Sequence, residues 1–224
     1  MSNPVYVAVD TPDLAKAEAL AGAVRPHVGG LKLGLEFFMA NGPAGVRRMA
    51  AFGLPIFLDV KLHDIGNTMA GAMRALSPLG VAVVNLHAAA GEAAMAAARA
   101  AMDPATKMLA VTVLTSFDDT DLRAIGVSAG LPDQVLRLAA AAHRAGLQGI
   151  VCSGAEIAAI RAAWPGAVLA VPGLRPPGTA HGDQKRVMTP AEAYAAGASI
   201  LVVGRPITAA ADPAAAAREV AASL

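Results

Sequence analysis

The chain repeats one unit, a short apolar run followed by an alanine-rich stretch of helical character, eight times along its length. The runs are continuous rather than alternating in polarity, which is typical of strands buried on both faces of a parallel sheet. Strands that alternate with helices imply right-handed crossovers, and eight such units favour closure into a barrel. The expected strands are residues 5–10, 31–34, 56–61, 81–87, 108–114, 149–153, 168–172 and 200–204.

Proline and glycine mark the ends of the expected helices. Proline is favoured at the first helical position and glycine just past the last one, and Thr189 with Glu192 forms a capping box. We therefore expect an α/β fold, a (β/α)8 TIM barrel, as a single domain over residues 1–224, with an open doubly wound sheet as the structural alternative. The prolines are Pro12, Pro132, Pro190 and Pro213, and the glycines are Gly53, Gly80, Gly146 and Gly197.

Composition excludes several classes of partner. The 18 basic and 17 acidic residues give a net charge of +1, so the chain has no electrostatic footprint for nucleic acid or an anionic membrane. The single cysteine, Cys152, excludes an internal disulfide and fits a reducing compartment. The first residues lack a targeting pattern, and no apolar run approaches the ~20 residues of a membrane span. We expect a soluble cytoplasmic protein with no nucleic-acid or membrane partner.

Charged residues interrupt the third expected strand, where Asp59 and Lys61 are followed by Asp64. Because a strand alternates its faces, Asp59 and Lys61 point the same way, and Asp64 lies just beyond the strand, free to turn back. Ionised groups are costly to bury unless they are paired, so the pattern favours a functional site. A structural ion pair inside the barrel is the alternative interpretation.

Polar residues gather where the expected strands end, which is where barrels of this type carry their chemistry. Loops after the seventh and eighth strands are the usual phosphate site, and each of these two loops joins a glycine to an arginine. Glycine lets backbone N–H groups approach an anion, and arginine offers a planar fork that matches phosphate oxygens. The sequence therefore predicts a small phosphorylated substrate. The residues at the strand ends are Asp10, Lys32, Asp59, Lys61, Asp64, His87, Thr115, Ser116, Arg175 and Arg205.

Three segments together carry a family resemblance: Asp59-Val60-Lys61-Leu62-His63-Asp64-Ile65, Gly182-Asp183-Gln184-Lys185-Arg186-Val187 and Val202-Val203-Gly204-Arg205-Pro206-Ile207. In combination they closely resemble the orotidine 5'-monophosphate decarboxylase family in its shorter bacterial form. The first segment alone is less specific, since related phosphosugar barrels share it. One departure is Gly66, where many members have proline, and this is expected to loosen the loop that carries Asp64.

The resemblance implies decarboxylation of orotidine 5'-phosphate to uridine 5'-phosphate, the last step of de novo UMP biosynthesis, with no metal and no organic cofactor. Lys61 is implied to be the proton donor to C6, placed between Asp59 and Asp64, and Lys32 extends this charged array. The implied substrate-binding residues are Asp10, Lys32, Asp59, Ile65, Thr68, Thr115, Ser116, Arg175, Gln184, Gly204 and Arg205.

Within that set the resemblance implies separate tasks. Asp10 and Lys32 are implied to hold the ribose hydroxyls. Thr115 and Ser116 are implied to contact the pyrimidine. The phosphate is implied to bind Arg175, Gln184, Gly204 and Arg205. Across a homodimer interface, Asp64, Ile65 and Thr68 are implied to reach the neighbouring subunit's site.

Two other functions remain open from the residues themselves. A hexulose-phosphate synthase, or another phosphosugar lyase or epimerase of similar barrel type, would explain Asp59, Lys61 and the phosphate loops; it would call for a divalent metal and would leave the loop of Gln184 unexplained. A non-catalytic nucleotide-binding barrel would tolerate the loss of one charge, and no charge is missing here.

Overall fold

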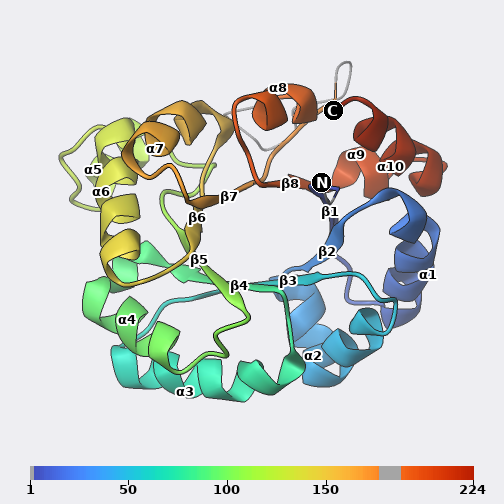
Figure 1. The fold of residues 1–224 in the computed structure, drawn as a ribbon, viewed down its shortest axis with the longest axis horizontal. Coiled ribbons are helices and arrows are strands. Elements are labelled where there is room, and N and C mark those ends of the chain that lie inside the picture. The colour runs from blue at the N-terminus through green and yellow to red at the C-terminus, as the bar shows by residue number, and fades with distance from the viewer. Residues whose placement is uncertain (1–2, 177–187) are drawn as a thin grey trace.

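The computed structural model describes residues 3–176 and 188–224 of the chain. Its strands form a closed barrel in sequence order, and every neighbouring pair runs parallel (Figure 1). The predicted TIM barrel is therefore confirmed, and the open-sheet alternative is wrong. The strands are β1 (Val5–Val9), β2 (Gly30–Leu33), β3 (Ile56–Leu62), β4 (Val83–His87), β5 (Lys107–Val111), β6 (Gly149–Val151), β7 (Val168–Val171) and β8 (Ile200–Val203).

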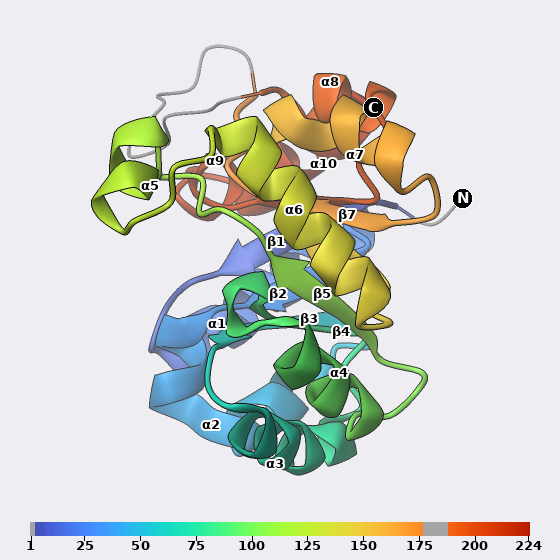
Figure 2. The ribbon, with the colours of Figure 1, turned by 90° about the vertical axis from the view of Figure 1, so that its left-hand side faces the viewer.

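Helices surround the barrel. Figure 2 shows α1 to α4 on one side of the strands and α6 to α10 on the other. Short 3-10 turns lie at 25–27, 77–79, 88–90 and 154–156. The described helices are α1 (Leu14–Val24), α2 (Leu35–Ala50), α3 (Gly66–Leu76), α4 (Glu92–Ala100), α5 (Asp119–Ala124), α6 (Leu131–Arg144), α7 (Ile157–Ala163), α8 (Pro190–Ala195), α9 (Arg205–Thr208) and α10 (Pro213–Ala222).

The helix boundaries largely follow the signals in the sequence. The capping box of Thr189 and Glu192 opens α8, and α6 and α10 carry proline in their first turn. The expected stop glycines all adopt positive φ, a conformation that lacks the Cβ penalty only for glycine. One start differs, because α1 begins at Leu14 with Asp13 as its cap, so Pro12 precedes the cap.

Two apolar layers hold the barrel together. The inner layer fills the barrel with side chains such as Phe57, Leu109 and Val202. The outer layer packs the other face of the strands against the helices and includes Leu58, Val84 and Leu86. Each strand is buried on both faces, which explains the continuous apolar runs of the sequence. Among the described residues, no helix has both the length and the apolar character of a membrane span.

Candidate active site

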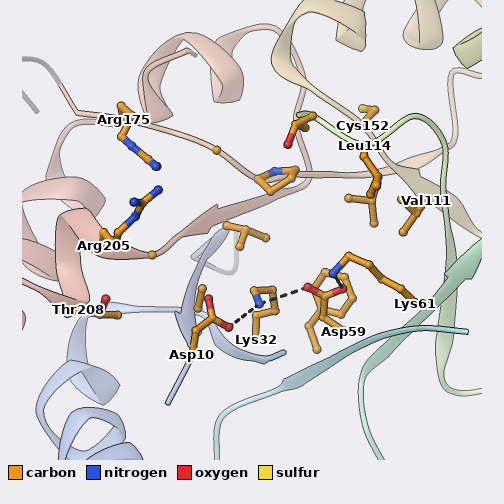
Figure 3. Close-up of a pocket in the computed structure, with 18 of the residues that line it drawn as sticks. Asp10, Lys32, Asp59, Lys61, Val111, Leu114, Cys152, Arg175, Arg205 and Thr208 are labelled. Atoms are coloured by element: carbon orange, nitrogen blue, oxygen red, sulfur yellow. Dashed lines mark hydrogen bonds and ion pairs between the residues drawn. The ribbon is translucent and has the colours of Figure 1, made fainter. Parts of the chain in front are cut away.

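A cavity of about 560 Å³ opens at the carboxyl ends of the strands, where this architecture carries its chemistry (Figure 3). Its lining brings together residues from β1, β2, β3, β5, β6, β7 and β8 or the loops that follow them. The predicted site residues that line it are Asp10, Lys32, Asp59, Lys61, Thr115, Arg175, Gly204 and Arg205.

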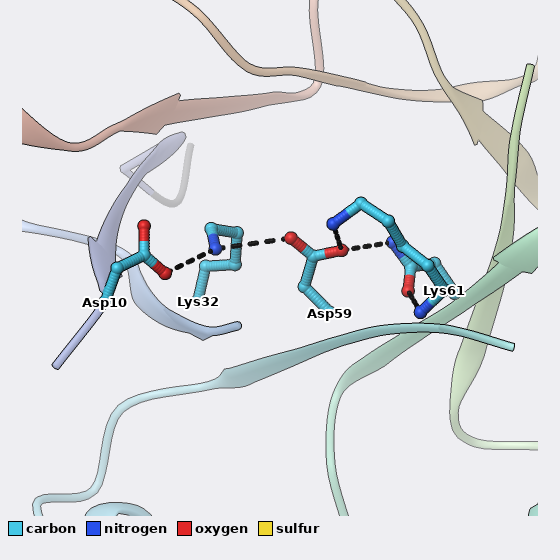
Figure 4. Close-up of polar contacts among 5 residues, drawn as sticks. Asp10, Lys32, Asp59 and Lys61 are labelled. Carbon is cyan, nitrogen blue, oxygen red and sulfur yellow. Dashed lines mark hydrogen bonds and ion pairs between the residues drawn. The ribbon is translucent and has the colours of Figure 1, made fainter. Parts of the chain in front are cut away.

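Four charged side chains of alternating sign cross the floor of this cavity (Figure 4). Lys32 Nζ lies 3.1 Å from Asp10 Oδ1 and 3.2 Å from Asp59 Oδ2. Lys61 Nζ lies 2.7 Å from Asp59 Oδ1. The two oxygens of Asp59 thus hold one ammonium group each, which fixes both amines in place.

Asp59 stays ionised although it is buried. The residue is only 8% exposed, and burial by itself would raise its pKa. The ammonium groups of Lys32 and Lys61 act the other way, and hydrogen bonds from Lys61 and Asn85 add to them, so the net pKa lies below the ordinary aspartate value. The site therefore supplies an ionised carboxylate that keeps Lys61 oriented.

A glycine directly after β2 gives space to these charges. A Cβ on Gly34 would lie 2.6 Å from Asp10 Oδ1 and 3.0 Å from Lys32 Nζ. A side chain at this position would displace the Asp10 carboxylate or the Lys32 amine, so Gly34 leaves the room that the pair occupies.

Two arginines occupy the opposite end of the cavity from Lys61. Figure 3 shows the side chains of Arg175 and Arg205 directed toward one another. Arg175 is 7% exposed, and its Nη1 donates to the carbonyl of Leu174 at 2.9 Å. Gly173 precedes this loop segment with φ +76, and Gly204 leads into α9. Two converging guanidinium groups beside glycine backbone are suited to an anion such as phosphate.

The structure places the remaining predicted site residues elsewhere. Asp64, Ile65, Thr68 and Ser116 are exposed and do not line the cavity. The carboxylate of Asp64 accepts a hydrogen bond from the N–H of Ile65 at 2.7 Å. Within the described part of the chain it forms no ion pair with Lys61, whose amine binds Asp59 instead. Gln184 lies outside the described residues.

Asn85 is a site residue that the sequence analysis missed. It is fully buried on β4 and contacts both Asp59 and Lys61. The available signal was a single amide inside the apolar run of residues 81–87, on the strand that follows the Asp-x-Lys strand. Buried polar groups need hydrogen-bond partners, so such an amide indicates a partner of matching chemistry.

Two histidines border the Lys61 end of the site. The rings of His63 and His87 lie with their centroids 5.5 Å apart. Burial lowers the pKa of His87, and the charges of His63 and Lys61 lower it further. Among the residues that the structure describes, no group of three or more His, Cys, Asp or Glu side chains is arranged to hold a metal ion.

Comparison with known proteins identifies the family of the chain. Residues 3–220 match the orotidine 5'-phosphate decarboxylase / HUMPS family. The chain belongs to this family. A protein of Sphingopyxis alaskensis named orotidine 5'-phosphate decarboxylase is 58% identical to the present chain over 224 residues, which is 100% of both chains. A protein of the same name from Novosphingobium aromaticivorans is 56% identical over 224 residues, again 100% of both.

Solved structures resemble this member of the decarboxylase / HUMPS family over nearly its whole length. The Lactobacillus acidophilus orotidine 5'-phosphate decarboxylase has a TM-score of 0.87 and 32% identity, covering 99% of each chain. The Methanocaldococcus jannaschii orotidine 5'-monophosphate decarboxylase, complexed with inhibitor BMP, has a TM-score of 0.82 and covers 100% of this chain and 99% of its own. At 16% identity the second likeness concerns the fold alone.

Proposed function

We propose that this chain decarboxylates orotidine 5'-phosphate to uridine 5'-phosphate and CO2, the final step of de novo UMP biosynthesis. The observation that carries the proposal is the Lys61 ammonium, held 2.7 Å from the buried Asp59 carboxylate and facing a cavity with two arginines at its far end. The names of relatives up to 58% identical over the full chain support it.

The proposed chemistry uses the charge of Lys61 directly. The bond between C6 and the carboxylate breaks, CO2 leaves, and the electron pair stays on C6 in the plane of the ring. This carbanion is poorly delocalised, so a fixed ammonium stabilises the charge as it develops and then transfers a proton to C6. Because the stabilising charge is a side chain, the proposed reaction requires no metal and no organic cofactor.

The remaining residues are proposed to bind the nucleotide along the cavity. Asp10 and Lys32, paired at 3.1 Å at the cavity floor, are suited to the ribose hydroxyls. Thr115 lines the cavity and is proposed to contact the pyrimidine together with Ser116. The phosphate is proposed to bind at the far end, and its contacts position C6 against Lys61 from a distance. The proposed phosphate ligands are Arg175, Gln184, Gly204 and Arg205.

A second subunit is proposed to complete each site. Ile65 is 72% exposed beside the exposed Asp64, and an exposed apolar side chain next to a charge is suited to an interface. We propose a homodimer in which Asp64, Ile65 and Thr68 enter the partner's cavity, so that Asp64 faces Lys61 across the interface. The chain is further proposed to act as one domain, residues 1–224, in the cytoplasm.

The test is CO2 release from orotidine 5'-phosphate by the purified protein in excess chelator. We expect turnover by the natural sequence that survives chelation. Lys61→Ala is expected to lose at least about a thousand-fold in kcat, because it removes both the stabilising charge and the proton donor. The same variant is expected to keep its affinity for uridine 5'-phosphate within about three-fold, because the phosphate binds elsewhere.

Three outcomes would contradict the proposal. Absence of turnover by the natural sequence would exclude the activity. CO2 release that stops on chelation and returns with a divalent ion would show that the reaction uses a metal, against the metal-free chemistry proposed here. Near-normal catalysis by Lys61→Ala would remove the role assigned to that residue.

A further inference from the structure

Asn85 lies in the middle of β4 and faces the interior of the barrel. It is 0% exposed, and Val83, two residues earlier on the same strand, belongs to the inner apolar layer. Its Oδ1 accepts a hydrogen bond from the backbone N–H of Lys61 at 2.8 Å. Its Nδ2 donates to Asp59 Oδ1 at 2.6 Å. One buried amide thus joins the backbone of the proposed proton donor to the carboxylate that orients its amine.

The pairing of β3 with β4 is irregular at this position. Leu58 pairs with Val84 and Leu62 pairs with Leu86, so three residues of β3 stand opposite Asn85 alone. In a regular ladder one residue of β4 cannot accept hydrogen bonds from three successive N–H groups of β3. A strand with extra residues therefore forms a bulge. The side-chain oxygen of Asn85 accepts the hydrogen bond from the N–H of Lys61, in place of a backbone carbonyl of the neighbouring strand.

At this bulge Lys61 adopts an unfavourable backbone conformation. Its φ is +48, and within the described part of the chain it is the one residue other than glycine with a positive φ. Such a conformation is unfavourable for a side-chain-bearing residue and persists only where the surroundings hold it. The contact that holds the Lys61 N–H is the carboxamide of Asn85.

We propose that Asn85 is a positioning residue of the decarboxylation reaction, which fixes the Lys61 backbone through its carbonyl oxygen and the Asp59 carboxylate through its amide. This inference rests on the proposed function. An amide suits the task because it carries an acceptor and a donor in one rigid plane. An aspartate would lack the donor, and an aliphatic side chain would lack both groups.

The donor half of the interaction also affects the charge of Asp59. The hydrogen bond from Asn85 is among the contacts that lower the pKa of Asp59, after the charges of Lys32 and Lys61. Asn85 therefore helps to keep Asp59 ionised in addition to fixing its orientation.

The test compares Asn85→Leu, which keeps the branched shape of the side chain and removes both hydrogen bonds, with the natural sequence. We expect kcat for orotidine 5'-phosphate to fall about a hundred-fold, because small misplacements of a reacting group are costly. KM and the affinity for uridine 5'-phosphate are expected to stay within about three-fold, because the arginine end of the cavity is untouched. A general loss of structure would change all three quantities together.

Thr112→Val is the matched control. Thr112 is also buried, 5% exposed, and its hydroxyl donates to the carbonyl of Val151 at 3.2 Å rather than to a charged side chain. This variant loses one buried hydrogen bond and is expected to keep kcat within about two-fold. Asn85→Ala serves as a second variant should the leucine prevent folding, and the same separation of kcat from KM is expected.

A measurement independent of activity keeps the two proposals apart. The Lys61 amide is expected to exchange its hydrogen for deuterium at least about ten-fold faster in the Asn85 variants than in the natural sequence. If the natural sequence releases no CO2, the proposed function fails, while the exchange rates still decide the role of Asn85. Unchanged exchange, or a kcat equal to that of Thr112→Val, would overturn the assignment.

Discussion

At the scale of single residues, Asp59 is the group on which the charged array depends. Its two oxygens bind different ammonium groups, Lys61 at 2.7 Å and Lys32 at 3.2 Å. Removing one partner of a buried ion pair leaves an uncompensated charge. The resulting destabilisation exceeds the net stabilisation that the pair provides. Asp59 therefore serves stability as well as orientation.

The pKa of Asp59 predicts how this stability depends on pH. Because the folded state lowers the pKa, the contribution of Asp59 is fully present above the unfolded aspartate pKa of about 4 and is lost as the pH falls through the lower native value. We expect Asp59→Asn to be about 3 kcal/mol less stable than the natural sequence between pH 5 and 7. The difference should shrink below about pH 4, as measured by urea unfolding at each pH.

Glu92→Gln provides the comparison for an exposed ion pair. Glu92 binds Arg144 at 2.8 Å, but the two side chains are 46% and 60% exposed. Its loss is expected to change the free energy of unfolding by less than about 1 kcal/mol. An Asp59→Asn variant as stable as Glu92→Gln at pH 7 would show that Asp59 does not hold the array together.

At the scale of elements, the sequence predicts the regular parts and misses the irregular ones. All eight strands were expected, because a continuous apolar run between helical stretches is a local signal. The positive φ of Lys61 was not, because it depends on a hydrogen bond to Asn85, 24 residues away. The break in α2 at Gly42, with φ +56 before Pro43, was missed as well. Alternation correctly directed Asp59 and Lys61 to one side.

The start of α3 allows a direct test of the glycine that departs from the family pattern. Gly66 is the first residue of α3, and Ile65 before it has φ −64 and ψ 154, the extended conformation that a following proline requires. A Cβ at Gly66 would meet Ala94 Cα at 3.4 Å, an ordinary contact. We expect Gly66→Pro to raise the free energy of unfolding by about 0.4–1 kcal/mol, because proline restricts the unfolded chain.

Gly71→Pro is the control on the same helix. Gly71 lies inside α3, where proline removes a backbone hydrogen bond and clashes with the preceding turn. This variant is expected to lose about 3 kcal/mol or more, measured by urea unfolding beside Gly66→Pro. A destabilised Gly66→Pro would mean that the loop before α3 needs the freedom of glycine.

At the scale of the whole molecule, the count of repeating units predicted the closed barrel, and the barrel brings residues distant in sequence to one cavity. Asp10 from the first unit and Arg205 from the last line the same space. A second subunit cannot be inferred from such a pattern, because contacts between chains leave no periodic signal. The exposed Ile65 and Asp64 are the features that support it.

The proposed sharing of sites between subunits predicts complementation between two inactive variants. In a hybrid of Lys61→Ala and Asp64→Asn subunits, one cavity has both substitutions and the other has neither. Equal mixing gives hybrids in about half of the dimers, so about a quarter of the natural activity should return. The measurement is CO2 release after the two variants are mixed and allowed to exchange subunits.

Each variant measured alone is the control, and a mass-tagged subunit reports the exchange. Recovery requires that Asp64 of one chain serve Lys61 of the other, because neither variant has an intact site of its own. If Asp64 and Lys61 of the same chain formed one site, every site in the mixture would carry one of the two substitutions, and mixing would restore no activity. Complete exchange with no recovered activity would therefore place Asp64 outside the partner's site and leave Lys61 to Asp59 and Lys32 of its own barrel.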